Sequence, residues 1–465
     1  MDIFIIGAGG GNASTYTQEA LSALQEAQVI LGAERLLAGV PAMNSDAKLW
    51  EAARPSEVCD VLARLKSENS GVRVVILQSG DTGFHSGCRF LVRKMKDLFG
   101  PLSDEVRNLR ILPGISSVQM LAARLQEPWQ DWLLVSGHGV SCDVLQYLMQ
   151  GKKIFMLTGG ALTPDVICSQ LVQAGLGDLG VYVASDLSCG DGIYVEKCAA
   201  QRTAAETLET CGGGADSTDI AGEAICRGTA SDFAHRKFPI MSVMLIDAAP
   251  VWRGYAAGIP DAEFIRGKVP MTKQEVRSVI LAKLAPCPDD VVWDVGAGTG
   301  SVSIELAHYA RQVWAFEKNR DAVELICANR RKLCAWNLRV VQGAAPEVFC
   351  ENAPGTHGNP EDTWKGQPSQ CAFPAPDKVF IGGSSGNLSG IVRYIAGMSA
   401  GVRICVSAVL LETLHETMDV FDELGFETDV VQVAVTRSER VAGKHMIKAG
   451  NPVWIITGSM PPGNQ

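Results

Sequence analysis

Short apolar segments alternate with amphipathic segments along most of the chain. Residues 18–27 and 58–65 each place apolar side chains on one face, a spacing that is typical of helices. Short apolar runs bounded by glycine, proline and polar residues predict strands instead. The alternation of the two kinds of segment predicts α/β architecture. In the first half, strands are expected at residues 3–6, 72–77, 132–135, 153–157, 181–184 and 241–246.

The pattern restarts after a stretch without periodicity. Residues 247–260 contain small residues, glycines and prolines, so we expect a boundary near Arg253, between domains 1–253 and 254–465. The second domain should begin with a helix capped by Thr272, with Glu275 three residues later as in a capping box. Its strands fit a doubly wound sheet that ends in an antiparallel hairpin. They are expected at residues 291–295, 313–316, 338–341, 378–381, 403–407, 428–433 and 453–457.

Composition narrows the class of protein. A chain of 465 residues is long enough for two sizeable cores, and residues 211–219 and 351–376 are too polar to add much to either, so we expect them to be surface insertions. The start lacks a basic segment with a cleavage site, and no apolar run approaches a membrane span, so we expect a cytoplasmic protein. The fourteen cysteines and seven histidines show no metal-ligand spacing, so no metal is expected. A net charge of −10 argues against nucleic acid as a partner and requires a locally basic pocket for any anionic substrate.

Residues 290–307 contain the most informative motif, an apolar strand that runs into a glycine-rich turn and then a helix. The Gly-x-Gly-x-Gly turn, with Thr299 inside it, allows close backbone approach to a ligand. Its spacing differs from that of dinucleotide folds, and Asp294 would repel a pyrophosphate, which disfavours a nicotinamide oxidoreductase. The Asp294 carboxylate suits the positive charges of S-adenosylmethionine (SAM), and Glu317, followed by Lys318, can accept from the ribose hydroxyls. The turn glycines are Gly296, Gly298 and Gly300.

Beyond this turn, residues 259–458 resemble the decarboxylating methyltransferase domain of corrin biosynthesis. Residues 259–277, 380–388 and 406–412 carry the resemblance, which implies a class I, Rossmann-like methyltransferase fold. It also implies that Thr272 helps to close over SAM and that Gly382 and Gly383 form a glycine loop at the cofactor. One position departs from the family, because Ala344 replaces an aspartate that accepts from the adenine amino group. The loss of that bond should weaken SAM binding by roughly 1 kcal/mol unless a neighbour or water replaces it.

The first half, 1–246, resembles a tetrapyrrole methylase, a two-lobed SAM-binding fold that methylates porphyrinoid macrocycles. Residues 5–12, 78–84, 112–118 and 129–139 carry the resemblance. Gly10 and Thr82 stand where the family has prolines, which should leave two loops less preorganised. The cofactor-binding residues that the resemblance implies are Gly7, Gly9, Gly80, Asp81, Gly83, Ser116, Ser117 and Leu157.

The fusion of these two halves implies a bifunctional enzyme of cobalamin biosynthesis with two SAM sites. Such an enzyme methylates C5 and C15 of precorrin-6B and removes the carboxyl group of the ring C acetate, giving precorrin-8. The same reactions on a cobalt-containing macrocycle, or a non-catalytic SAM-binding scaffold, are the alternatives. Isolated domains like the second half tend to form tetramers, so the resemblance also implies a homo-oligomer held through residues 259–458.

Proton transfer and carboxylate binding suggest further candidate residues. His138, between two glycines, could move a proton at neutral pH or make only a local hydrogen bond. Glu412 could donate a proton during decarboxylation or cap a helix at residues 413–424. A basic run near the C-terminus could bind substrate carboxylates or form a solvated loop. Its members are Arg437, Arg440, Lys444, His445 and Lys448.

Overall fold

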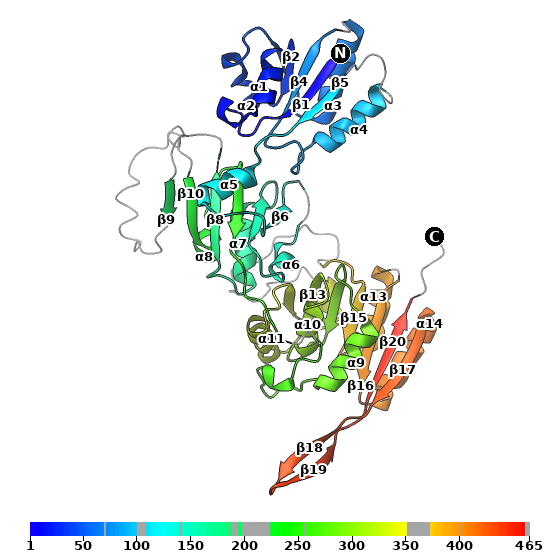
Figure 1. Cartoon of the computed structure of the whole chain (residues 1–465). Helices are drawn as coiled ribbons and strands as arrows, with labels where there is room; N and C mark the ends of the chain where they lie inside the picture. The colour runs from blue at the N-terminus through cyan, green and yellow to red at the C-terminus, as the bar shows by residue number, and fades with distance from the viewer. Residues whose placement is uncertain are drawn as a thin grey trace. The chain divides into compact units, whose positions relative to one another are not determined.

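The computed structural model divides into two compact units (Figure 1). Unit 1 comprises Met1–Cys142, Lys153–Cys168 and Leu179–Asp247, and unit 2 comprises Asp143–Lys152, Ser169–Asp178 and Ala248–Gln465. The predicted insertion at 211–219 lies outside the described residues, and of 351–376 only 373–376 are described. None of the described helices is long and apolar enough to cross a membrane. The structure describes residues 1–68, 71–99, 108–139, 142–185, 187, 194–197, 224–254, 257–350, 373–399 and 401–460.

Unit 1 contains two sheets, of which the first is wholly parallel, in the order β3-β2-β4-β1-β5. One face packs against α3 and α4 through residues such as Leu62 and Leu91, and the other packs against α1 and α2 through Leu24 and Leu36. Burial of both faces explains why the strands read as continuous apolar runs. The strands are β1 (Asp2–Gly7), β2 (Val29–Gly32), β3 (Lys48–Glu51), β4 (Arg73–Gln78) and β5 (Asn108–Leu112), and the helices are α1 (Gln18–Gln25), α2 (Glu34–Leu37), α3 (Pro55–Glu68) and α4 (Cys88–Phe99).

The second sheet of unit 1 is mixed, in the order β6-β7-β11-β8-β10-β9. Strand β11 pairs antiparallel with both β7 and β8, so the last strand of the unit lies at its centre. Helix α5 begins with a capping box in which Ser116 and Gln119 satisfy each other's backbone N–H groups. The strands are β6 (Leu133–Ser136), β7 (Ile154–Leu157), β8 (Gly180–Ser185), β9 (Tyr194–Lys197), β10 (Ala224–Thr229) and β11 (Ser242–Ile246), and the helices of this part of the chain are α5 (Ser117–Leu125), α6 (Val144–Leu148), α7 (Pro164–Gln173) and α8 (Ala230–Phe233).

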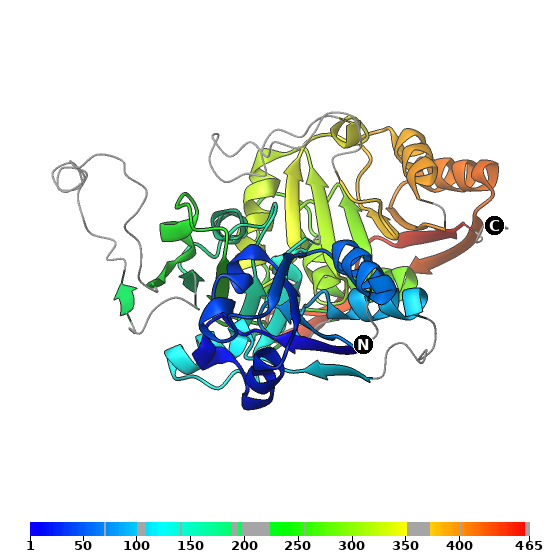
Figure 2. The ribbon, with the colours of Figure 1, turned by 90° about the horizontal axis from the view of Figure 1, so that it is seen from above.

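Unit 2 is built on a seven-stranded sheet in the order β14-β13-β12-β15-β16-β20-β17, and its parallel strands lie side by side in Figure 2. Neighbouring strands in the run β14-β13-β12-β15-β16 are parallel, and β20 pairs antiparallel with both β16 and β17. This order confirms the predicted doubly wound sheet with antiparallel final strands. The strands are β12 (Val291–Val295), β13 (Gln312–Glu317), β14 (Leu338–Gln342), β15 (Lys378–Ile381), β16 (Arg403–Ala408), β17 (Glu427–Val433) and β20 (Val453–Ser459).

Helices cover both faces of this sheet. Alternate residues of β12 point to opposite cores, Val292 to one and Trp293 to the other. The first core includes Ile280 and Leu306, and the second includes Ile391 and Phe421. The helices are α9 (Gln274–Leu284), α10 (Ser301–Ala307) and α11 (Arg320–Lys332) on the first face, and α12 (Glu347–Cys350), α13 (Leu388–Met398) and α14 (Leu411–Leu424) on the second.

Two sequence predictions about unit 2 were wrong in detail. Thr272 does not cap α9, because the helix begins one residue later, with Lys273 at its N-cap position and no side-chain cap bond there. Asp261 serves the helix instead, since its Oδ1 accepts from the backbone N of Gln274 at 3.0 Å. The final hairpin is also interrupted by a second one that the pattern did not reveal, β18 (Thr436–Val441) and β19 (Lys444–Ala449).

Candidate cofactor and substrate sites

The predicted nucleotide-binding turn links β12 to α10 and depends on glycine at three positions. Gly296, Gly298 and Gly300 have φ angles of 72°, 58° and 75°, which side chains rarely adopt. A Cβ atom on Gly296 would lie only 2.3 Å from the carbonyl oxygen of Gly383, on the loop after β15. Two backbone segments therefore touch where the carboxyl ends of β12 and β15 meet.

A cavity of about 880 Å³ opens beside this turn. The turn contributes Gly296, Gly298 and Thr299 to its wall, and the segment before α9 contributes Thr272 and Lys273. The hydroxyl Oγ1 of Thr299 is buried and has no hydrogen-bond partner among the described residues. Further wall residues are Glu317 from β13, Gly382 after β15, Ser407 from β16, Arg437 from β18 and Lys448 from β19.

Glu317 joins this cavity to a smaller one of about 150 Å³, since it lines both. Its carboxylate accepts from the backbone N of Gly298 at 2.8 Å and from that of Asn319 at 2.9 Å. The side chain is thereby fixed at the mouth of the glycine turn. The smaller cavity is also lined by Lys318, Ala344, Gly383, Ser384 and Ser385. The structure therefore groups the residues predicted at the two ends of the cofactor.

Asp294 lies behind the turn and not on either cavity wall. It is completely buried, with Oδ2 hydrogen-bonded to the hydroxyl of Ser303 and Oδ1 without a partner among the described residues. Burial, with a smaller contribution from the charge of Glu317, raises the pKa of Asp294 to about 7. The predicted contact with the charges of SAM remains a prediction.

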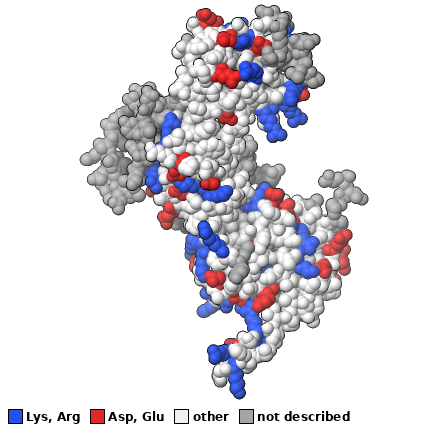
Figure 3. Space-filling view, viewed as in Figure 1, with Lys and Arg blue, Asp and Glu red and all other residues white. Residues whose placement is uncertain are grey.

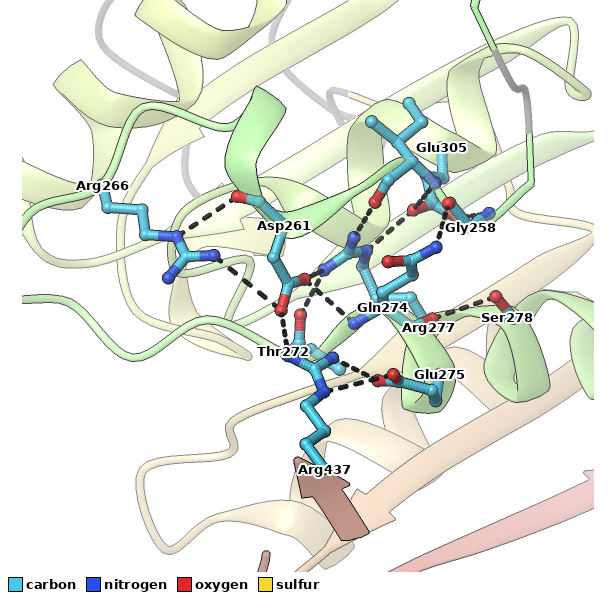
Figure 4. Close-up of polar contacts among 11 residues, drawn as sticks. Gly258, Asp261, Arg266, Thr272, Gln274, Glu275, Arg277, Ser278, Glu305 and Arg437 are labelled. Atoms are coloured by element: carbon cyan, nitrogen blue, oxygen red, sulfur yellow. Dashed lines mark hydrogen bonds and ion pairs between the residues drawn. The ribbon is translucent and has the colours of Figure 1, made fainter. Parts of the chain in front are cut away.

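A buried ion-pair network holds the segment before α9 against the turn (Figure 4). Arg277, on α9, donates to Glu305 at 2.8 Å and to Asp261 at 2.9 Å. Glu305 in turn accepts from the backbone N atoms of Gly258 at 2.9 Å and Ile259 at 3.0 Å. Sequence reasoning missed this network, because its members lie far apart in the chain and each looks like an ordinary surface charge.

The β18–β19 hairpin separates the residues of the basic run into two groups. Arg437 and Lys448 stand opposite each other near its base and line the cavity, whereas Arg440 faces His445 near the turn. Arg440, Lys444 and His445 do not reach the cavity wall, so they are not grouped with the other predicted site residues. In Figure 3, Lys and Arg side chains gather on this hairpin.

Glu412 is not part of the cavity wall either. Helix α14 begins at Leu411, two residues earlier than expected, so Glu412 lies exposed in its first turn. A carboxylate in the first turn stabilises a helix, because the N-terminal end of the helix dipole is positive. Leu410 occupies the N-cap position and no side chain caps the helix, so Glu412 neither caps α14 nor lines the cavity.

Unit 1 has its own cavity, of about 710 Å³, between elements of both of its sheets. Leu157 and His138 come from the second sheet and the loop after β6. Arg35, which sequence reasoning did not single out, also lines the cavity and donates to the hydroxyl of Ser79 at 2.5 Å. Predicted cofactor residues that share the wall are Gly9, Gly80, Asp81, Ser116 and Ser117.

The remaining predicted glycines of unit 1 act behind the wall. A Cβ atom on Gly7 would lie 2.5 Å from the backbone N of Gly114, so two loops touch there. Asp81 accepts from the backbone N of Gly83 at 2.7 Å and from that of Gly114 at 3.0 Å. Asp81 therefore forms the local turn and also ties that turn to the next loop.

The two positions that lack the family's prolines are held by threonine hydroxyls. The backbone N of Gly10 donates to Thr15 Oγ1 at 3.1 Å, and Thr82 Oγ1 donates to the carbonyl of Leu112 at 3.3 Å. Each bond restrains its loop in the folded state, although it cannot restrict the unfolded chain as proline does. His138 packs closely over Gly159, where a Cβ atom would lie 2.3 Å from its Nδ1.

Both halves match known families. Residues 2–197 match the tetrapyrrole (corrin/porphyrin) methylases, and residues 263–458 match the precorrin methyltransferase domain. A Sinorhizobium protein named precorrin-6Y C(5,15)-methyltransferase [decarboxylating] is 26% identical over 97% of this chain and 94% of its own. The chain belongs to the precorrin-6Y C5,15-methyltransferase (decarboxylating) family. Membership of this methyltransferase family implies the use of SAM.

Other relatives of this methyltransferase family match only the second half. A Sulfurisphaera tokodaii protein named "Probable cobalt-precorrin-6B C(15)-methyltransferase (decarboxylating)" is 32% identical over 44% of this chain and 98% of its own. A solved structure, of precorrin-6y C5,15-methyltransferase from Geobacter metallireducens, is 33% identical over 44% of this chain and 99% of that one, with a TM-score of 0.38.

The cavity residues of unit 2 fit SAM. Glycine backbone at Gly296 and Gly298 leaves room for close approach, the Thr299 hydroxyl lacks a partner, and Glu317 offers a fixed carboxylate for two hydroxyls. Ala344 lines the smaller cavity beside Ser384 and Ser385, whose hydroxyls are candidates to replace the missing aspartate.

Proposed function

We propose that the chain methylates C5 and C15 of precorrin-6B and removes the ring C acetate carboxyl as CO₂, with one SAM site in each unit. The observation that carries the proposal is the presence of a large cavity beside glycine-rich loops in both units, of about 710 Å³ and 880 Å³. Either cavity has room for more than a cofactor, as a reaction between SAM and a macrocycle requires.

The two methylations and the decarboxylation are divided between the two units. Relatives that match only the second half are named C(15)-methyltransferases (decarboxylating), so we assign C15 methylation and decarboxylation to unit 2. Methylation at C5 is then assigned to unit 1. SAM would supply the electrophilic methyl group, while the chain holds the macrocycle in line, excludes water and handles protons.

The metal-free macrocycle is the favoured substrate. The relative that covers nearly the whole chain is named for precorrin, whereas the shorter relatives are named for cobalt-precorrin. Incubation of the full chain with SAM and each macrocycle form, followed by product mass, tests this choice. Two added methyl groups and one lost CO₂ are expected with precorrin-6B, and turnover of the cobalt form alone would overturn the substrate assignment.

The division of labour is tested with variants of the full chain. Glu317→Ala should weaken CO₂ release and one methylation, and Asp81→Ala should impair only the other methylation, because Glu317 lines cavities of unit 2 alone and Asp81 lines the cavity of unit 1. A matched pair of fragments, 1–247 and 248–465, repeats the test for the part of unit 2 that follows Asp247, since Asp143–Lys152 and Ser169–Asp178 remain in the first fragment. The second fragment starts at Ala248 and so retains Pro250, whose carbonyl oxygen accepts a hydrogen bond from Trp336 Nε1 at 2.7 Å. A second fragment that adds two methyl groups would refute the assignment.

We also propose that the chain is a homo-oligomer, a tetramer, held through residues 259–458. Hairpin β18–β19 supports this, because Val441, Met446 and Ile447 are exposed on it. Light scattering at micromolar concentration should give a mass about four times the 49.6 kDa of one chain. A monomer, both for the full chain and for fragment 248–465, would contradict the proposal.

A further inference from the structure

Hairpin β18–β19 lines the large cavity of unit 2 with the part on the side of its base, which comprises Arg437, Ser438 and Glu439 of β18 and Lys448 and Ala449 of β19. Arg437 and Lys448 are register partners there. Directly opposed residues of an antiparallel pair point to the same face of the ribbon. Both also line the cavity, so this face of the hairpin forms part of its wall.

Few contacts fix the hairpin in place. Every described side chain of β18 and β19 is exposed, so no apolar packing holds the two strands. At the base, the backbone N of Gly450 donates to the carbonyl of Val435 at 2.9 Å. Among the described residues, the other polar attachment of the hairpin to the body of unit 2 is the guanidinium of Arg437.

That guanidinium is shared between two carboxylates (Figure 4). Its Nη1 donates to Asp261 Oδ2 at 3.2 Å, its Nε donates to Glu275 Oε1 at 3.2 Å, and its Nη2 donates to Glu275 Oε2. Asp261 is nearly buried and is itself held by Arg277 at 2.9 Å. The hairpin is thus fastened to a rigid network, and three of the five N–H donors of Arg437 are engaged with two carboxylates that already balance its charge.

The lysines of the same cavity are less engaged. Lys448 meets Glu439 at 3.2 Å, but both side chains are more than half exposed, so the pair is weak. Lys273, at the N-cap position of α9, lines the cavity and has no ion pair among the described residues. The ammonium groups of Lys448 and Lys273 can therefore turn towards an incoming carboxylate with little loss of existing interaction energy.

We propose that Arg437 is a positioning residue that fastens hairpin β18–β19 over the cavity, and that Lys448 and Lys273 bind carboxylates of the macrocycle there. The proposal deepens the proposed function and rests on it for the identity of the substrate. It also replaces the sequence-based interpretation of Arg437 as a carboxylate clamp. The acidic chain, with a net charge of −10, then acquires its basic patch locally.

The test uses the full chain with precorrin-6B and SAM. Lys448→Gln and Lys273→Gln should each raise the KM for CO₂ release about tenfold, with kcat and the Kd for SAM nearly unchanged. Arg437→Gln should raise the KM similarly and also speed hydrogen exchange across residues 436–449. Arg437→Lys should not rescue, since an ammonium cannot match the two-carboxylate geometry. The control is Arg393→Gln, which alters an exposed arginine on α13 whose one ion pair among the described residues is with Glu423, and it should change neither readout.

The double variant Arg437→Gln/Lys448→Gln separates fastening from direct binding. If Arg437 acts by placing Lys448, the double variant should be little worse than Arg437→Gln alone. Unchanged exchange and an unchanged KM in Arg437→Gln, or fully multiplicative effects in the double variant, would overturn the proposal. Absence of any turnover by the unaltered chain would instead defeat the proposed function, while the exchange measurement would still test the fastening.

Discussion

The Nε atom of Arg277 lies 2.8 Å from Glu305 Oε1, and both side chains are completely buried. The pair joins α9 to α10, the helix that follows the glycine turn. Because Glu305 also accepts from the backbone of Gly258 and Ile259, the pair holds the segment that brings Thr272 to the cavity wall. Charges inside the domain thus position its binding site.

Glu305→Gln should destabilise unit 2 strongly. The substitution removes one of the two carboxylates that pair with the buried Arg277 and leaves Asp261 as its remaining anionic partner, which costs up to about 3–5 kcal/mol for buried pairs of this kind. Calorimetry of the full chain should show the loss in the transition of unit 2. Glu324→Gln is the control, because its pair with Arg320 at 3.4 Å is largely exposed, and it should change stability by less than about 1 kcal/mol.

Gly296→Ala should damage the turn of unit 2. Its φ of 72° is strained for alanine, and the new Cβ would lie 2.3 Å from the carbonyl oxygen of Gly383. We expect a loss of about 2–4 kcal/mol of stability, together with weaker SAM binding. Gly397→Ala, in α13 with no atom near its Cβ position, should instead stabilise by up to about 1 kcal/mol. Equal effects of the two changes would contradict the argument.

Glu317→Ala should weaken SAM binding by about 1.5–3 kcal/mol in unit 2 only, because it removes a charged acceptor for the ribose hydroxyls. The variant also frees the backbone N of Gly298, so Glu317→Gln, which keeps one acceptor oxygen, should lose less. Titration calorimetry with the full chain gives both affinities. An unaltered affinity at both sites would exclude the predicted role.

Asp294 should make the stability of unit 2 fall as pH rises. Its folded pKa of about 7 lies above the unfolded value, so the folded state keeps a proton that the unfolded state releases. The contribution is therefore fully present below about pH 4 and is lost as pH rises through 7. Asparagine at this position cannot titrate. In Asp294→Asn, the loss of unfolding free energy between pH 4 and pH 8, followed by thermal unfolding, should therefore be smaller by a few kcal/mol. An unchanged slope would show that Asp294 is ionised throughout.

The sheet and the glycine turn of unit 2 could be predicted because their signals are local. Apolar runs such as 291–295 identify strands, and three glycines at that spacing allow few backbone conformations. The hairpin β18–β19 could not, since all of its described side chains are exposed and its sequence has no apolar alternation. Whether a charged residue meets a ligand or another residue depends on contacts between distant segments.

Arg437 and Arg35 illustrate this limit from opposite sides. Arg437 belongs to a basic run and was predicted to bind substrate, yet its partners Asp261 and Glu275 lie more than a hundred residues away in the chain. Arg35 lies outside every motif recognised in the sequence, yet it lines the cavity of unit 1. The sequence supplies the charges, and the tertiary structure decides how they are used.

The aromatic cluster around Phe316 brackets the stretch from Cys350 to Phe373. Phe349 and Phe373 lie on either side of that stretch, and their ring centroids are 5.0 Å and 5.2 Å from that of Phe316. Two chain ends that meet at one ring can be joined by a short linker at a small entropic cost. The same spot can also carry a fused reporter domain, with the sheet order of unit 2 preserved.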